Sequence, residues 1–145
     1  MLLSNACEYG LRAALYLASL KQEGYVPIRK ISGELDISFP FLTKIFQMLT
    51  QAGLLTSYRG PNGGVALSRS ADRIRLREII LAIDGPALFE ECVLGLPGCG
   101  EQKPCPLHAR WAVERDRIEQ MFAASTLAEM ADKIGSPDVR LKSLC

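Results

Sequence analysis

Hydrophobic residues recur every three or four positions in several stretches of this chain, which is the spacing of one face of an α-helix. The first stretch follows Ser4 or Asn5 as N-cap and ends before Gly24 and Pro27, and the others lie at about 29–35, 39–52, 75–83, 106–124 and 127–134. The third is the clearest: Leu42, Ile45, Phe46 and Leu49 form one apolar stripe. Ser38 precedes it as an N-cap residue, Pro40 falls in the first turn, and Gly53 follows the end. The pattern therefore predicts a mainly α-helical protein.

Two β-prone runs, 54–58 and 65–68, interrupt the helical pattern and are joined by Arg59-Gly60-Pro61-Asn62-Gly63-Gly64. A glycine-rich connection between two such runs predicts a β-hairpin with an extended loop. Helix, short helix, turn, helix and hairpin is the order of a winged helix-turn-helix. The predicted fold is thus mainly α with a small β-hairpin wing and a long C-terminal helix. We expect a winged-helix domain at 1–84, a cysteine-containing loop at 85–106, and a long helix with its tail at 107–145.

The polar face of the helix at 39–52 has the properties needed to enter a DNA major groove, because its back is apolar and its front is polar. The residues expected to contact DNA from this helix are Ser38, Pro40, Thr43, Lys44 and Gln47, and those from the wing are Arg59, Asn62, Gly63 and Gly64. Arg59 suits a narrow minor groove, and the wing glycines allow the backbone to approach phosphates closely. The alternative is an ordinary surface helix followed by an ordinary turn.

Composition changes this picture little. The chain has 145 residues, of which 48% are hydrophobic and 23% charged, so it is expected to be one globular unit rather than disordered or collagen-like. Residues 1–70 contain seven Lys and Arg against four Asp and Glu, a mildly basic balance compatible with a phosphate-facing surface. The longest near-apolar stretch, 11–20, is too short to cross a bilayer, and no secretory signal is evident. We therefore expect a soluble, cytoplasmic protein with no membrane partner.

Three of the five cysteines lie close together in a segment rich in glycine and proline. Cys92, Cys99 and Cys105 are followed by the only histidine, His108. Clustered thiols in a chain without an export signal more often bind metal or sense redox state than form disulfides, and thiolates favour Zn²⁺ or iron–sulfur clusters. The gaps are longer than those of zinc knuckles and match neither ferredoxin spacing. Three merely free thiols are the alternative, and Cys7 and Cys145 are expected to be incidental.

Together, Glu8-Tyr9-Gly10-Leu11-Arg12-Ala13, the wing at 59–64 and the Cys92/Cys99/Cys105/His108 loop resemble the IscR/NsrR-type family of iron–sulfur winged-helix transcription regulators. The resemblance spans nearly the whole chain. It implies a homodimer joined by the helix at 106–124, a cluster near the N-terminus of that helix, and palindromic operator DNA as the partner. Thr43 and Lys44 replace the acidic residue and glutamine of IscR-like members, so base preference cannot be transferred.

The same resemblance leaves the fourth cluster ligand open. IscR-like members use a histidine placed like His108, and NsrR-like members use a carboxylate of the partner subunit, for which Glu8 is in the matching position. His108 is slightly favoured because it is three residues from Cys105 and needs no second chain. Since both candidates are present, either a 2Fe–2S or a 4Fe–4S cluster is compatible with the sequence.

The functional prediction is a homodimeric DNA-binding transcription regulator that senses redox state, nitric oxide or iron–sulfur status through a cluster held by Cys92, Cys99 and Cys105. A zinc-binding or thiol-based redox regulator on the same fold is the first alternative. A small cluster carrier or electron-transfer protein is the second, and it would need neither Lys44 nor Arg59. An enzyme is not expected, because the chain has one histidine, no paired carboxylates at diagnostic spacing and no nucleophile elbow.

Overall fold

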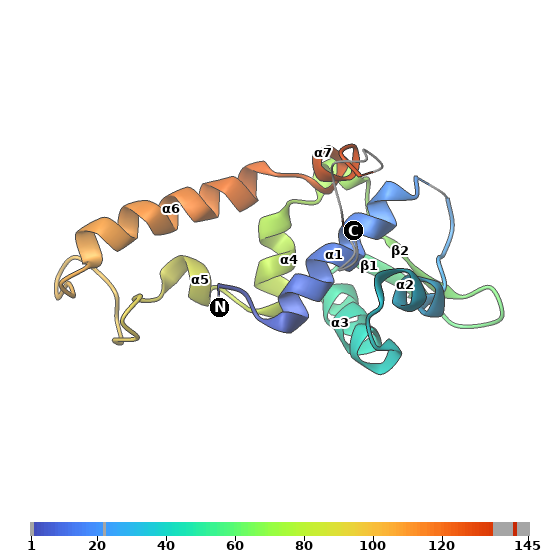
Figure 1. Cartoon of the computed structure of the whole chain (residues 1–145), viewed down its shortest axis with the longest axis horizontal. Helices are drawn as coiled ribbons and strands as arrows, with labels where there is room; N and C mark the ends of the chain where they lie inside the picture. Colours follow the sequence, from blue (N-terminus) through green and yellow to red (C-terminus); the bar gives the residue numbers. More distant parts are fainter. Residues whose placement is uncertain (1, 22, 135–140, 142–145) are drawn as a thin grey trace.

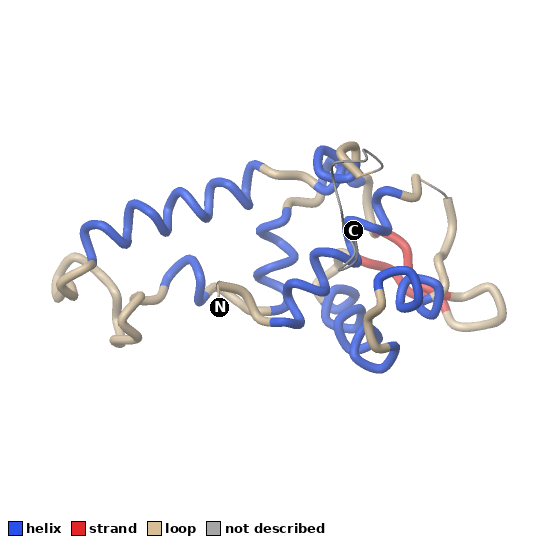
Figure 2. Tube along the Cα trace, in the orientation of Figure 1, coloured by secondary structure: helices blue, strands red, loops and turns tan. Residues whose placement is uncertain are grey.

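The computed structural model describes residues 2–21, 23–134 and 141, and it has helices throughout with one small sheet (Figures 1 and 2). The helices and strands, in chain order, are α1 (Asn5–Ser19), α2 (Ile28–Leu35), α3 (Phe39–Gln51), β1 (Leu55–Tyr58), β2 (Gly64–Leu67), the 3₁₀ turn η1 (Ala71–Arg73), α4 (Leu76–Ile83), α5 (Ala87–Glu90), α6 (His108–Ala124) and α7 (Leu127–Ala131). The predicted order of helix, short helix, helix, hairpin and long helix is confirmed.

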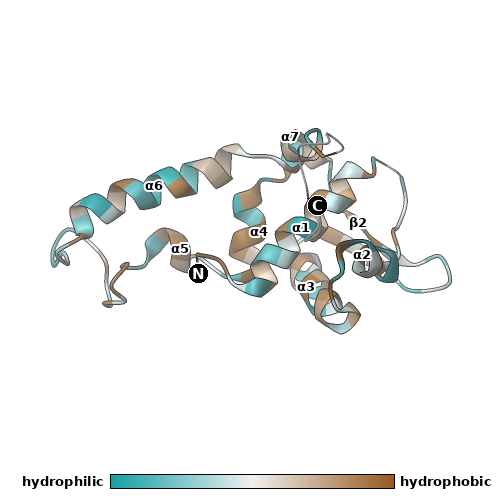
Figure 3. Ribbon diagram, in the orientation of Figure 1, coloured by the Kyte–Doolittle hydropathy of each residue, from teal (hydrophilic) through white to brown (hydrophobic). Residues whose placement is uncertain are grey.

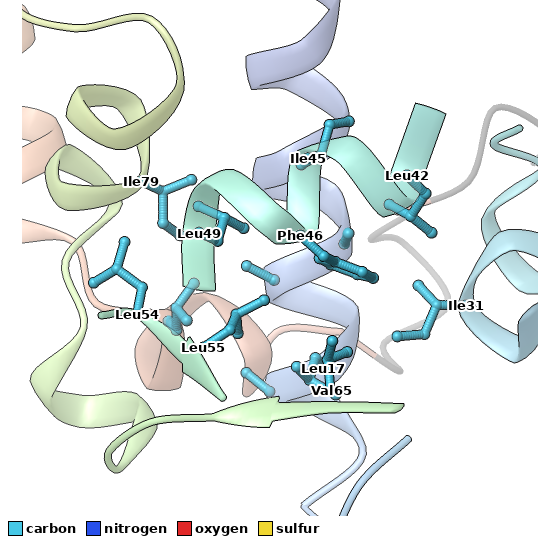
Figure 4. Close-up of a cluster of buried hydrophobic side chains, with 14 of the residues drawn as sticks. Leu17, Ile31, Leu42, Ile45, Phe46, Leu49, Leu54, Leu55, Val65 and Ile79 are labelled. Carbon is cyan, nitrogen blue, oxygen red and sulfur yellow. The ribbon is translucent and has the colours of Figure 1, made fainter. Parts of the chain in front are cut away.

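The hydrophobic core is built around α3, whose apolar stripe faces α1, α2, α4 and β1 (Figure 4). Leu42, Ile45, Phe46 and Leu49 are all buried, as their spacing predicted. Ile31 from α2 and Val65 from β2 close the core on the side of the hairpin. This packing leaves the opposite face of α3 on the surface.

The wing is an antiparallel hairpin in which Leu55 pairs with Leu67 and Tyr58 with Gly64. A short extended segment before α2 adds to its edge: the N–H of Val26 donates to the carbonyl of Val65, and the N–H of Val65 donates back, each at 2.9 Å. The hairpin is therefore attached through backbone hydrogen bonds to the segment that leads into the helix-turn-helix.

The segment containing α5 and the cysteine loop runs out from the core, and α6 runs back along it, so that the two form an extended arm (Figure 1). None of the 17 residues of α6 is buried, and Val113 and Met121 are half-exposed. Figure 3 shows apolar and polar patches alternating along this arm. After α6 the chain returns to the core, where Leu127 of α7 is fully buried and α7 packs against α1. Among the described residues, no helix has the length and apolarity needed to span a bilayer.

Several predicted boundaries differ from the structure by one to three residues. The strand predicted from Leu54 begins at Leu55, because the N–H of Leu54 donates to the carbonyl of Leu49 and closes α3. The second strand lies at 64–67 instead of 65–68. The helix predicted from Arg75 begins one residue later, since Arg75 is extended and its N–H donates to Glu78.

The other differences concern helix ends and one missed element. α6 begins at His108, two residues after the predicted start, and α7 ends at Ala131 and not Ile134. The short helix α5 was not predicted, because four residues cannot display a helical period. Residues 91–107, all described, form no helix or strand, as the glycines and prolines there predicted. Cys145 lies outside the described residues.

Candidate DNA-binding surface and cysteine loop

The exposed face of α3 is held in place at its N-terminus by Ser38, whose hydroxyl accepts a hydrogen bond from the N–H of Phe41 at 3.5 Å. Lys44 and Gln47 are exposed, and the described residues supply no partner for either. Thr43 is half-buried, and its hydroxyl donates to the carbonyl of Phe39 at 2.8 Å. Of these polar side chains, Lys44 and Gln47 are thus the most available to an external ligand.

A cleft between α3 and the wing brings together five of the nine residues predicted to contact DNA. Its lining includes Thr43, Gln47, Arg59, Gly63 and Gly64, together with Arg29 and Tyr58. The other four, Ser38, Pro40, Lys44 and Asn62, lie outside this lining. The described lining contains two arginines and no carboxylate, so the cleft presents positive charge.

Arg29 and Tyr58 are members of this surface that sequence reasoning missed. The guanidinium of Arg29 lies 4.3 Å from the ring centroid of Phe39, at the start of α3. The ring of Tyr58 lies 5.5 Å from that of Tyr25, and both rings are exposed. A basic residue in the first turn of α2 and an aromatic residue directly before Arg59 were the signals in the sequence.

Gly63 and Gly64 of the wing have structural roles that the sequence did not reveal. A Cβ on Gly64, whose φ is +151°, would lie 2.0 Å from the carbonyl oxygen of Val26. A Cβ on Gly63 would lie 2.3 Å from the carbonyl oxygen of Tyr58. The absence of side chains at 63 and 64 is therefore required for the turn itself and for its contact with the segment before α2.

In the cysteine loop, Cys92 lies two residues after the end of α5 and is buried. The backbone N–H groups of Leu96 and Leu94 point at its sulfur and lower the pKa of the thiol below its ordinary value, and a hydrogen bond with Cys105 acts in the same direction. The loop thus folds around this sulfur and favours its thiolate form, which is the form that binds metal.

A second pair forms between Cys99 and the first residue of α6. The Sγ of Cys99 lies 3.4 Å from Nδ1 of His108, and both side chains are half-buried. Arg115, two turns further along α6, donates from Nη1 to the same sulfur at 3.3 Å. These contacts connect the middle of the loop to α6.

The structure therefore gathers the four predicted ligands as two pairs, Cys92 with Cys105 and Cys99 with His108. It does not bring all four to one point: no group of three or more histidine, cysteine or acidic side chains among the described residues is arranged to hold a metal ion. The donor set nevertheless suits a thiolate-bound cluster. The Nε–H of Arg115, beside Cys99, is also buried without a hydrogen-bond acceptor, which an anionic sulfur-containing group in the loop would supply.

The first turn of α1 contains the alternative ligand, Glu8, and Cys7. Glu8 is exposed at the surface of this chain. Cys7 is fully buried, and burial together with the nearby Asp84 carboxylate raises the pKa of its thiol to about 12. Cys7 is accordingly a neutral core residue, distinct in its chemistry from the loop cysteines.

Comparison with known proteins places most of the chain in one family. The family model described as Rrf2, iron-dependent transcriptional regulator, matches residues 3–133. The chain belongs to the Rrf2 family. Among relatives of this Rrf2 protein, the HTH-type transcriptional regulator IscR of Xenorhabdus nematophila is 36% identical over 130 residues, covering 90% of this chain and 79% of the relative.

Solved structures of Rrf2 relatives share the fold. T. potens IscR matches with a TM-score of 0.74 and 26% identity, covering 95% of this chain and 91% of that one. CymR, the global cysteine regulator of B. subtilis, matches with a TM-score of 0.77 and 26% identity, covering 90% and 95%. The predicted winged-helix transcription regulator is thereby confirmed.

Proposed function

We propose that this Rrf2 protein is a homodimeric regulator that binds palindromic operator DNA through α3 and the wing. It responds to redox state, nitric oxide or iron–sulfur status through a cluster in the loop at 85–106. The observation that carries the proposal is that the cysteine loop contacts the N-terminal half of α6, which begins at His108. Cys99 contacts both His108 and Arg115 of α6, and Cys92 contacts Cys105 just before it. Binding or loss of a cluster in the loop would therefore change contacts with α6, the helix expected to join the two subunits.

The DNA-binding half of the proposal is supported by the cleft between α3 and the wing. Gln47 and Arg59 line it, and Lys44 lies exposed on the same helix. Arginine and lysine neutralise phosphates, while short polar side chains on an exposed helix reach base edges in the major groove. The back of α3 is fixed in the core, so its orientation on DNA follows that of the whole domain.

The homodimer is supported by the composition of α6. In the single chain this helix buries no residue, yet Leu107 before it and Val113 and Met121 within it expose apolar side chains. A helix with unburied apolar side chains is stabilised when a second copy covers them. A two-fold dimer presents two copies of α3, and two-fold symmetry matches an inverted repeat in DNA.

The loop residues would hold the cluster in distinct ways. Cys92, Cys99 and Cys105 would supply thiolates, and backbone amides already favour the thiolate of Cys92. His108 is supported as the fourth ligand by its 3.4 Å contact with Cys99, whereas Glu8 would have to come from the partner subunit. When bound, an iron–sulfur cluster supplies a centre that oxidants and nitric oxide attack, and it is either of the 2Fe–2S or the 4Fe–4S type.

The test is anaerobic purification followed by iron and sulfide analysis and visible absorption, with Cys99→Ala as the matched variant. The wild type is expected to contain both elements and to absorb in the visible range, and the variant to lose the cluster while keeping its folded wing domain. A randomised duplex library should then yield an inverted repeat whose affinity differs between loaded wild type and Cys99→Ala. Colourless wild-type protein, or equal affinities, would contradict the proposal.

The fourth ligand is separated by two further variants, His108→Ala and Glu8→Gln. If His108 is the ligand, His108→Ala shifts the visible spectrum and releases iron faster, and Glu8→Gln leaves both unchanged. The reverse result assigns the ligand to the partner's carboxylate.

A thiol-based regulator is the second candidate, favoured by the interaction with Cys105 that helps to lower the pKa of the Cys92 thiol. A peroxide could oxidise these two thiols to a disulfide, taking two electrons and two protons and forming water. Metal-free wild type whose DNA affinity responds to peroxide, together with loss of that response in Cys105→Ser, would favour this candidate over the cluster.

A further inference from the structure

Arg115 of α6 hydrogen-bonds with the cysteine loop at several points, although no pattern in the sequence distinguishes it from the other charged residues of this helix. Its Nη1 donates to the carbonyl of Glu90 at 2.9 Å, to that of Glu91 at 3.2 Å and to the sulfur of Cys99 at 3.3 Å. One side chain of α6 therefore contacts both the end of α5 and a proposed cluster ligand.

A second side chain of α6 also hydrogen-bonds the end of α5. The indole Nε1 of Trp111, one turn before Arg115, donates to the carbonyl of Glu91 at 2.9 Å. The carbonyls at the end of α5 have no helical partner of their own, so these donors satisfy them. Trp111 and Arg115 together hold the end of α5 against α6.

The route continues from α5 into the DNA-binding domain. Phe89 of α5 is buried against Cys7 and Ile80, and the guanidinium of Arg77 in α4 lies 5.4 Å from its ring centroid. Arg77 in turn forms an ion pair with Glu119 of α6 at 2.8 Å. A displacement of α5 is thus expected to reach α4, which also packs against α3.

We infer that Arg115 is the positioning residue that couples the cysteine loop to the DNA-binding domain, by hydrogen-bonding the Cys99 sulfur on one side and the end of α5 on the other. The inference rests on the proposed function. Arg115 and Cys99 line the same cleft, and the buried Nε–H of Arg115, which has no acceptor among the described residues, would provide a further donor for a loaded cluster. Hydrogen bonds and positive charge near cluster sulfurs raise the reduction potential.

The test compares Arg115→Met, which keeps an apolar stem but removes charge and donors, with Arg115→Lys, which keeps the charge. Arg117→Met is the matched control, because Arg117 is an exposed arginine on the same helix that forms only a 3.5 Å surface ion pair with Glu114 among the described residues. All are prepared as full-length protein, both metal-free and loaded anaerobically with ferrous iron and sulfide.

Two measurements are made. In metal-free protein, Arg115→Met is expected to speed backbone hydrogen exchange in residues 87–99 by about tenfold, since several hydrogen bonds are lost together. In loaded protein, the reduction potential is expected to shift negative in Arg115→Met, to recover in part in Arg115→Lys, and to stay unchanged in Arg117→Met. A merely structural arginine would change the exchange alone.

The outcomes separate the two proposals. Wild type that takes up no iron and sulfide overturns the proposed function and this inference with it. Loaded wild type with an Arg115→Met variant of unchanged potential, or with unchanged exchange in the metal-free form, overturns the role of Arg115 and leaves the proposed function standing.

Discussion

Replacing Gly64 with alanine tests whether the wing is held by its contact with the segment before α2. Gly64 has a φ of +151°, and a Cβ there would meet the backbone oxygen and carbon of Val26 at 2.0 and 2.4 Å. Because these atoms are backbone, no side-chain rotation relieves the clash. We expect the hairpin to move away from Val26 and the two 2.9 Å hydrogen bonds between Val26 and Val65 to break.

The size of the effect follows from two contributions. Holding a residue with a side chain in this region of backbone space costs about 1–3 kcal/mol. Each lost hydrogen bond contributes about 0.5–1.5 kcal/mol, so the pair contributes about 1–3 kcal/mol. The unfolding free energy should therefore fall by about 2–6 kcal/mol, and the melting temperature by about 3 °C for each kcal/mol in a chain of this size.

Gly60 supplies the matched control for urea and thermal denaturation followed by circular dichroism. Its φ is +134°, but the nearest atom to a Cβ there is a side-chain carbon of Tyr58 at 3.5 Å. Gly60→Ala should thus show the backbone cost alone, about 1–3 kcal/mol. Equal losses of stability in the two variants would refute the reasoning, because the backbone clash at Gly64 would then contribute nothing.

Three further predictions concern the DNA-facing surface and the first turn of α1. Lys44→Ala and Arg59→Ala should each weaken binding to all DNA duplexes, because each removes one phosphate contact. Each should also reduce the slope of log affinity against log salt concentration by about 1. An unchanged slope in fluorescence anisotropy titrations would contradict this prediction. The fold raises the pKa of the Cys7 thiol from 9.0 to about 12, so the folded state favours the neutral thiol. The resulting stabilisation is fully present below pH 9.0 and is lost as the pH rises toward 12. Wild type should therefore lose stability more steeply above pH 9.0 than Cys7→Ala does, and parallel curves in urea denaturation would refute the assignment. Ser4 caps α1 by accepting a hydrogen bond from the N–H of Cys7 at 3.0 Å, and it also contacts Asp84. Ser4→Ala should therefore lower the unfolding free energy by about 1–2 kcal/mol. A loss below about 0.3 kcal/mol would show that the cap is dispensable.

Elements whose signals are local could be predicted from the amino-acid sequence. The stripe of Leu42, Ile45, Phe46 and Leu49 predicted both α3 and its buried face, because helical spacing and burial are linked by the 3.6-residue turn. Ser38 was also predicted as the N-cap of α3, because a capping side chain bonds to backbone only a few residues away. The cysteine spacing identified the loop, and the whole-chain motifs indicated the family.

Contacts between residues that are distant in the sequence could not be predicted, because they depend on how the elements pack. The requirement for glycine at position 64 depends on Val26, which lies far before it in the chain. The role of Arg115 depends on which of the charges of α6 faces α5, and the pairing of Cys92 with Cys105 and of Cys99 with His108 depends on how an irregular loop folds back on itself. Such contacts have no periodic signature, because they are set by the packing of separate elements and not by the repeat of any one of them.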